Sequence, residues 1–238
     1  MPHPTDAPLL DLHTRVPQAK PFATLEDVRA YDLGMRKSAL MAYLKPAKRI
    51  LAHCTPHTRH LVEVGVNTGV LSLYLGARLP EAALSGVEEN ATLLEVAEDN
   101  LSLAVWAATP GDIEFELAKL HKLPFADASA DLIYSFSSLH LWKKPVETLQ
   151  EIARVAQPEC RVLIFDMNRQ AEEGHITFVL QFVKEGAREF MDSLRASYCP
   201  EEVRELLKQA GLAHWHVYED ELGLLIASHP QDDLSPAA

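Results

Sequence analysis

The first regular feature of the chain is a long stretch with the periodicity of a helix. Apolar residues recur at helical spacing from about Thr24 to Leu44, and Thr24 and Asp27 have the spacing of a capping box. Pro46 favours a break, with a short second helix that reaches Ala52. We therefore expect two helices before the first strand.

Short apolar runs and amphipathic stretches then alternate. The apolar runs predict strands at 60–66, 83–88, 131–139 and 161–167, and an alternation of apolar and polar residues predicts another at 112–118. The amphipathic stretches predict helices at 69–79, 90–107, 144–156, 175–196 and 200–211. Because alternating strands and helices form parallel units, this order predicts a parallel sheet with helices on both faces.

The last stretch departs from this alternation. Residues 213–228 indicate two strands joined by an acidic turn. Such a direct connection is antiparallel, because a parallel return requires a long crossover. The predicted fold is therefore α/β, a Rossmann-like, seven-stranded, mostly parallel sheet with an antiparallel edge strand and helices on both faces.

Composition limits the class of protein. The chain has 238 residues, 47% of them hydrophobic, which suits one domain at 23–230 after a flexible, proline-rich lead-in at 1–22. A net charge of −12 disfavours nucleic acid as a partner. The N-terminus lacks the pattern of a signal peptide, and no apolar run is long enough for a membrane helix. Three widely spaced cysteines fit the cytoplasm, and a homodimer is compatible with all of this.

The stretch "LVEVGVNTGVL" carries the strongest local signal. A strand containing Glu63 meets Gly65 and Gly69, and a helix follows. In such sheets ligands bind at the carboxyl ends of the strands, where glycine lets the backbone approach them. Asn67, between the glycines, tolerates the left-handed conformation that the loop needs. The alternative is a plain turn that requires glycine for its geometry alone.

The second predicted strand ends in an acid that suits a ribose. Glu88 follows the apolar run directly, at about the distance from the glycine turn at which a carboxylate accepts hydrogen bonds from ribose hydroxyls. Glu89 competes for this role. Val70 stands where a dinucleotide-binding motif has its third glycine, so the spacing disfavours a nucleotide-dependent oxidoreductase.

Several motifs in order resemble one family. "VEVGVNTG" resembles the motif E/D-x-G-x-G-x-G, and "GVEEN" resembles the acidic end of its second strand. "KLPFADASADLIYSFSSLHLW" and "EIARVAQPECRVLIFD" resemble the segments that lead into the fourth and fifth strands. Together they resemble the class I S-adenosylmethionine-dependent methyltransferases, close to the small-molecule enzymes that include quinone-biosynthesis C-methyltransferases.

The resemblance implies S-adenosyl-L-methionine as cofactor, a small-molecule substrate and a set of binding residues. Glu63 and the Gly65–Gly69 loop would hold the methionine portion, and Glu88 the ribose hydroxyls. The segment 118–121 would lie by the adenine, and 136–141 near the methyl group. The implied cofactor-binding residues are Glu63, Gly65, Asn67, Gly69, Glu88, Lys119, Leu120 and Ser137.

Two departures from the family pattern fall within the implied cofactor site. Asn67 replaces a glycine, and Lys119 stands where an aspartate often accepts from the adenine amino group. A charged lysine has no acceptor, so another group, such as a backbone carbonyl, would have to serve. These departures motivate an alternative, a non-catalytic or regulatory domain that kept the fold.

Methyl transfer from a sulfonium needs an aligned acceptor, and a base only if the acceptor arrives protonated. His140, after the fourth predicted strand, is the candidate base; a packing histidine is the alternative, and His175 is a second candidate. A helical lid around 170–200 carries residues that suit an apolar acceptor or simply a core face: Phe178, Phe182, Phe190, Met191 and Tyr198.

A run of possible metal ligands precedes the first predicted strand. His53, Cys54, His57 and His60 are residue types found in zinc sites, but their spacing matches no motif of that kind. We therefore expect no metal.

Overall fold

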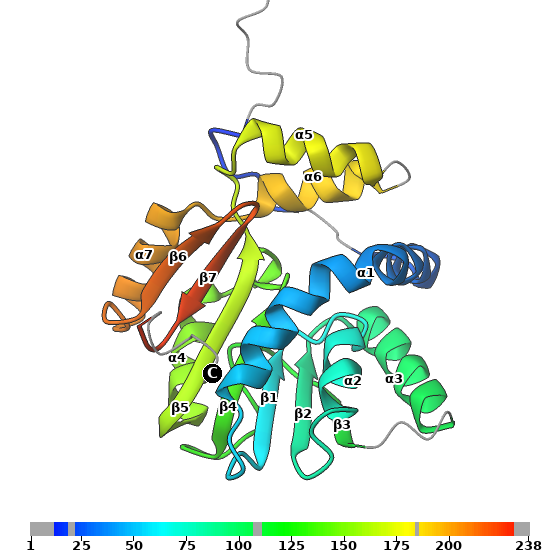
Figure 1. Ribbon diagram of the computed structural model, residues 1–238. Coiled ribbons are helices and arrows are strands. Elements are labelled where there is room, and N and C mark those ends of the chain that lie inside the picture. Colours follow the sequence, from blue (N-terminus) through cyan, green and yellow to red (C-terminus); the bar gives the residue numbers. More distant parts are fainter. Residues whose placement is uncertain (1–11, 19–21, 107–110, 184–185, 231–238) are drawn as a thin grey trace, which may run out of the picture.

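The computed structural model describes residues 12–18, 22–106, 111–183 and 186–230. Its centre is one seven-stranded sheet with the order β3-β2-β1-β4-β5-β7-β6 (Figure 1). The strands are β1 (His60–Val64), β2 (Ala83–Glu88), β3 (Asp112–Leu117), β4 (Ala130–Phe136), β5 (Ala156–Met167), β6 (His216–Asp220) and β7 (Gly223–Ala227).

The strand directions confirm the predicted fold class. Strands β1 to β5 pair in parallel, and β7 pairs antiparallel with both β5 and β6. The antiparallel strand thus lies second from the edge. The order reverses between β1 and β4, so the loops that follow these strands diverge and leave a crevice at the carboxyl edge.

Helices cover both faces of the sheet (Figure 1). Alternation along β1 explains this: Leu61 packs with α1 and α2, whereas Val62 and Val64 pack with α4 and α7. The helices are α1 (Leu25–His53), α2 (Val70–Gly76), α3 (Ala91–Trp106), α4 (Pro145–Val155), α5 (Glu173–Phe182), α6 (Ala187–Ala196) and α7 (Pro200–Gln209), with a short 3-10 turn, η1 (Leu139–Leu141).

The first helix corrects one expectation. The capping box is present, since the Asp27 N–H donates to Thr24 Oγ1 and the Thr24 N–H donates to Asp27 Oδ2, each at 3.1 Å. The predicted break at Pro46 is wrong, because α1 runs through it without interruption. Ala47 and Ile50, just beyond the proline, are fully buried against the sheet. We attribute the continuity to this burial, which offsets the lost backbone hydrogen bond.

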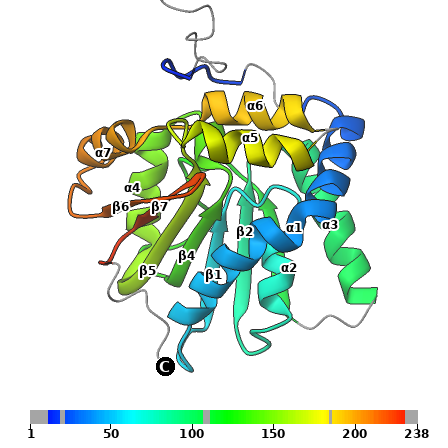
Figure 2. The ribbon, with the colours of Figure 1, turned by 45° about the horizontal axis from the view of Figure 1, so that its top comes forward.

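Two further segments lie beyond the carboxyl edge of the sheet. Helices α5 and α6 run side by side across it, near the start of α1, at the predicted position of the lid (Figure 2). Of the lead-in, residues 12–18 contact α6, whereas 1–11 and 19–21 lie outside the described residues, so its flexibility stays a prediction. Within the described part of the chain, no helix combines the length and apolarity required to cross a membrane.

Candidate functional site

The loop after β1 has the backbone conformation expected from its sequence. Gly65 and Gly69 have φ values of +80° and +76°, and Asn67 also lies in the left-handed region, with φ of 54°. Asn67 Nδ2 donates to the Phe136 carbonyl at 3.0 Å, which ties the loop to the end of β4. The prediction that Asn67 tolerates this conformation is confirmed.

The glycines are needed for packing as well as for φ. A Cβ at Gly65 would lie 1.8 Å from Ser138 Oγ, and one at Gly69 would lie 2.9 Å from the Phe115 ring. Close packing within the protein therefore accounts for both glycines without a ligand. In the same loop, the buried Oγ1 of Thr68 has no hydrogen-bond partner among the described residues.

Replacing Gly65 with alanine should destabilise the fold. The new Cβ would be forced to φ of +80° and into Ser138 Oγ, so we expect a loss of about 2 kcal/mol or more in unfolding free energy. The melting temperature should then fall by roughly 4–8 °C. Gly34→Ala is the control, because a Cβ there meets nothing within 4 Å and α1 should gain stability. An unchanged melting temperature for Gly65→Ala would contradict this packing.

Glu88 joins the loop after β1 to the turn after β2. Its Oε2 accepts the Asn67 N–H, and its Oε1 accepts the N–H groups of Glu89 and Asn90, each at 3.0 Å. Burial raises the pKa of Glu88 to about 7, and these three N–H donors counteract the rise. A carboxylate accepts about four hydrogen bonds, so capacity remains for a ligand hydroxyl.

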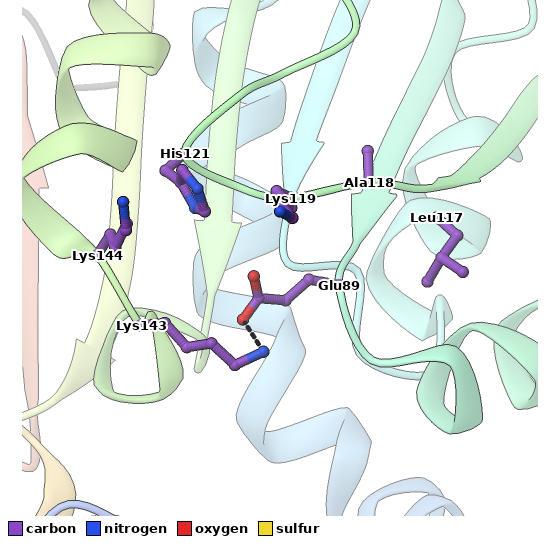
Figure 3. Close-up of a pocket in the computed structure, with 7 residues that line it drawn as sticks. All are labelled: Glu89, Leu117, Ala118, Lys119, His121, Lys143 and Lys144. Atoms are coloured by element: carbon purple, nitrogen blue, oxygen red, sulfur yellow. Dashed lines mark ion pairs between the residues drawn. The ribbon is translucent and has the colours of Figure 1, made fainter.

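Glu89, the competing acid, faces a different partner. Its carboxylate pairs with Lys143 Nζ at 2.9 Å, across a cavity of about 490 Å³ (Figure 3). This volume is in the range of small-molecule pockets. Lys119 lies at the cavity from the loop after β3, and no carboxylate among the described residues pairs with it. The other residues lining the cavity are Leu117, Ala118, His121 and Lys144.

Two residues of the predicted set lie beneath the site. Glu63 is buried in β1 and accepts a hydrogen bond from Ser72 Oγ, which also contacts the Tyr134 hydroxyl at 2.8 Å. Burial raises the pKa of Glu63 to about 8. The Leu120 side chain belongs to the hydrophobic core. These contacts favour support of the site from below, and a direct ligand contact of either side chain stays a prediction.

His140 is held by a carboxylate that sequence reasoning did not single out. The backbone N–H of His140 donates to Asp166 Oδ2 at 2.7 Å, and the ring nitrogen Nδ1 of His140 lies 2.8 Å from Asp166 Oδ1. With Asp166 ionised, Nδ1 carries the proton, so Nε2 bears the lone pair. No other described residue bonds to Nε2. Asp166 ends the apolar run of β5 as Glu88 ends that of β2, so the same sequence rule would have found it.

Ser137 shapes the turn that carries this histidine. It adopts a left-handed φ of 50°, and its N–H donates to the Phe165 carbonyl at 2.8 Å. This bond pins the chain between β4 and η1 to the end of β5. Ser137 therefore lies at the carboxyl edge, as predicted, and a contact to a cofactor stays a prediction.

The residues expected to line the lid do not form one surface. Phe178 and Phe182 are 60% and 71% exposed, and their ring centroids lie 5.0 Å apart on α5. Met191 and Tyr198 are buried instead. His175, the second candidate base, lies on α5 with a buried Nδ1 that has no described partner. None of these residues lines the cavity beside Lys119.

Two of the four candidate metal ligands near β1 have structural partners. His60 lies between the Ser129 carbonyl and Ser85 Oγ, at 3.1 and 2.9 Å. Cys54 Sγ lies 3.4 Å from the Ile50 carbonyl. In the described ranges, no three side chains of the metal-ligating types come together.

Known proteins match the core of this chain. A family model described as a methyltransferase domain matches residues 62–164. The O-methyltransferase resE of Aspergillus sclerotiorum is 32% identical over 109 residues, which make up 46% of this chain and 40% of that protein. The ubiquinone/menaquinone biosynthesis C-methyltransferase UbiE of Geotalea daltonii is 26% identical over 109 residues, 45% of each chain. The matched part thus spans less than half the length of either relative.

Solved structures share the fold over most of the chain. A SAM-dependent methyltransferase from Aquifex aeolicus has a TM-score of 0.63 at 17% identity, with 86% of this chain and 97% of that chain covered. The plantazolicin methyltransferase BpumL, solved with SAH, has a TM-score of 0.68 at 16% identity, with 85% and 78% covered. At such identities the likeness concerns the fold. The match of a methyltransferase-domain model to residues 62–164, within this shared fold, makes the chain similar to the class I S-adenosylmethionine-dependent methyltransferases.

Proposed function

We propose that the protein transfers a methyl group from S-adenosylmethionine to a hydroxyl group of a small molecule. The observation that carries this proposal is the position of Glu88, which is bonded to the N–H groups of both turns at the reversal of strand order. This is where the fold places a ribose.

The residues present fit the cofactor. Glu88 has capacity left for a sugar hydroxyl, and Thr68 Oγ1 is a buried polar atom without a protein partner. The cavity beside Lys119 is large enough for a purine base. Lys119 offers no acceptor to an adenine amino group. We therefore expect backbone atoms of the segment 118–121 to accept the hydrogen bond from that amino group.

The pairing of His140 with Asp166 supports a hydroxyl acceptor. When bound, S-adenosylmethionine supplies an electrophilic methyl group. His140 Nε2, which has no protein partner, takes the proton of the acceptor hydroxyl. Asp166 keeps the other proton on Nδ1 and stabilises the imidazolium that forms. Helices α5 and α6, beyond the carboxyl edge, are positioned to keep water from the acceptor.

Several relatives are named for this chemistry. The O-methyltransferases resE and cnsE match 46% and 45% of this chain, at 32% and 33% identity. Others are named as malonyl-[acyl-carrier protein] O-methyltransferases or as a quinone-biosynthesis C-methyltransferase. Oxygen as the acceptor atom therefore agrees with the base that we assign, and carbon is the alternative that a product analysis would reveal.

Two measurements test the proposal. Titration calorimetry with S-adenosylmethionine, S-adenosylhomocysteine and NADH should give binding of the first two alone. Transfer of a radiolabelled methyl group to a panel of phenols, alcohols, amines and activated carbon acids should label hydroxyl compounds. Failure to bind S-adenosylmethionine at millimolar concentration would favour a non-catalytic domain, and tight NADH binding would favour an oxidoreductase.

We also propose a cytoplasmic location and a small-molecule partner rather than nucleic acid. Cys54, Cys160 and Cys199 are unpaired, as expected in a reducing compartment. The net charge of −12 opposes binding to phosphate backbones. A homodimer is compatible with this proposal, and light scattering would test it.

Lys119→Asp should strengthen cofactor binding. An aspartate there would accept from the adenine amino group, a hydrogen bond that we expect to lower the dissociation constant about threefold to tenfold. Lys122→Asp is the matched control, because the charge change is the same and Lys122 does not line the cavity. Equal effects of the two substitutions in calorimetry would contradict an adenine beside Lys119.

Cofactor affinity should depend on pH through Glu88. Its pKa of about 7 means that the folded protein keeps the carboxyl protonated over part of the range in which the unfolded chain has lost the proton. Affinity should rise from about pH 6 to about pH 8, as the accepting carboxylate forms, whereas the unfolding free energy falls between the ordinary carboxyl pKa and about 7. Calorimetry across this range should show the rise in affinity, and Glu88→Gln should lack it.

A further inference from the structure

The N-terminal strap, residues 12–18, is attached to the lid. The Val16 N–H donates to the Arg195 carbonyl at 2.9 Å, and Gln18 Nε2 donates to Ser193 Oγ at 3.0 Å. At its other end, the Leu12 carbonyl accepts from the buried Arg169 at 2.9 Å. The strap therefore follows the end of α6 and is held along its length.

Arg15 connects the strap to two parts of the site. Its Nε donates to the Ala196 carbonyl at 2.6 Å, at the last residue of α6, and its Nη2 donates to the His140 carbonyl at 3.0 Å. The guanidinium lies 3.9 Å from the centroid of the Tyr198 ring. Because the guanidinium is planar and rigid, these bonds fix the distance between the end of the lid and the His140 turn.

The turn that Arg15 holds is short. The backbone of η1 is closed by two bonds, from Leu141 to Ser138 at 2.8 Å and from Trp142 to Leu139 at 3.1 Å. Asp166 holds the N–H and Nδ1 of His140 from one side. Arg15 holds the carbonyl of His140 from the other. Such a clamp matters because a displacement of about 1 Å at a reacting group can reduce the rate about 100-fold.

We propose that Arg15 is a positioning residue. It sets the spacing between the lid and the imidazole of His140, so that an acceptor bound under α5 and α6 lies within reach of Nε2. The role in catalysis rests on the proposed function of His140, whereas the coupling of lid and turn does not. Arg15 has no carboxylate partner among the described residues, and its guanidinium hydrogen bonds go to the carbonyls of the two segments that it joins.

The first test needs no acceptor. Diethyl pyrocarbonate modifies accessible imidazole nitrogens, and mass spectrometry resolves the rate at each histidine. In Arg15→Ala, the rate at His140 should rise about threefold or more, with hydrogen exchange accelerated at 139–142 and 187–197 together. The rate at His121, which lines the cavity beside Lys119 and has no hydrogen bond to Arg15 in the described part of the chain, should not change. Arg15→Lys, which keeps the charge and one donor, should restore part of the protection.

Arg78→Ala is the matched control for removal of an arginine. Arg78 also lies over a ring, 3.5 Å from the Tyr74 centroid, and donates to the Tyr74 carbonyl at 2.9 Å. It is exposed and follows the C-terminal end of α2, and no hydrogen bond or ion pair among the described residues joins it to the His140 turn, so His140 should react as in the wild type. An unchanged rate at His140 in Arg15→Ala would overturn the proposal. If that variant melts early, the same comparison is made with Arg15→Gln.

The second test separates this proposal from the proposed function. With a hydroxyl acceptor from the panel, Arg15→Ala should lower kcat about tenfold or more and change the S-adenosylhomocysteine dissociation constant less than about threefold. Equal losses in kcat and cofactor affinity would overturn a positioning role. If the wild type transfers no methyl group, the proposed function fails, and the reactivity and exchange data alone decide whether Arg15 couples the lid to the turn.

Discussion

Glu88→Gln is expected to weaken the binding of S-adenosylmethionine by about 10-fold to 100-fold, as charged hydrogen bonds contribute about 1.5–3 kcal/mol. The substitution removes the charge that we propose accepts the ribose hydroxyls. It also places an amide donor against the N–H groups of Asn67, Glu89 and Asn90. Titration calorimetry measures the loss, and thermal unfolding reports any damage to the loop.

A thermodynamic cycle that combines the Glu88 substitution with a change in the ligand separates loss of the ribose contact from damage to the loop. The wild type should bind S-adenosylhomocysteine more tightly than its 2′-deoxyribose analogue, and Glu88→Gln should bind the two with similar affinity. Glu89→Gln is the matched control, and we expect less than about a threefold change, because Glu89 already pairs with Lys143, whose side chain is exposed. A larger loss for Glu89→Gln than for Glu88→Gln would reverse the assignment of the two acids.

His140→Gln is expected to lower kcat by about 10²-fold to 10⁴-fold, the usual contribution of a general base. Glutamine has no basic nitrogen, so the acceptor hydroxyl would lose its proton only to water. Cofactor affinity should change less than about threefold, since His140 is assigned to the acceptor. The measurement is a single-turnover assay of radiolabelled methyl transfer, with calorimetry in parallel.

Asp166→Asn gives a second measure of the same pair. The asparagine keeps one acceptor oxygen for the His140 backbone, but the ring loses the charge that stabilises the imidazolium. We expect kcat to fall, and the double variant should be little worse than His140→Gln alone. Wild-type kcat in His140→Gln would show that the acceptor needs no base from this histidine.

The parts of the fold that the sequence predicts are those with strong local patterns. Apolar runs predict β1, β2, β4 and β5, and alternation of apolar and polar residues predicts β3. The short connection between β6 and β7 predicts the closing antiparallel pair. Glu88 was predictable for the same reason, because an acid directly after an apolar run has to lie at the end of a strand. Asn67 was predictable because its neighbours require a left-handed residue.

The parts that escaped prediction depend on contacts between distant residues. Arg15 meets His140 across 125 positions of the chain, and no local pattern marks Arg15 or this contact. Pro46 lies inside α1 because burial of its neighbours outweighs its local preference. The Glu63 carboxylate lies beside Ser72 and Tyr134, and these partners come from α2 and β4, so the local sequence around Glu63 does not reveal them.

The most direct test of the central claim is a crystal structure of the protein with S-adenosylhomocysteine. The account predicts ribose hydroxyls within hydrogen-bond distance of the Glu88 carboxylate, the amino-acid portion against the backbone of 65–69, and the base in the cavity beside Lys119. Density for the ligand elsewhere, or a crevice still filled by protein side chains at saturating ligand, would contradict it.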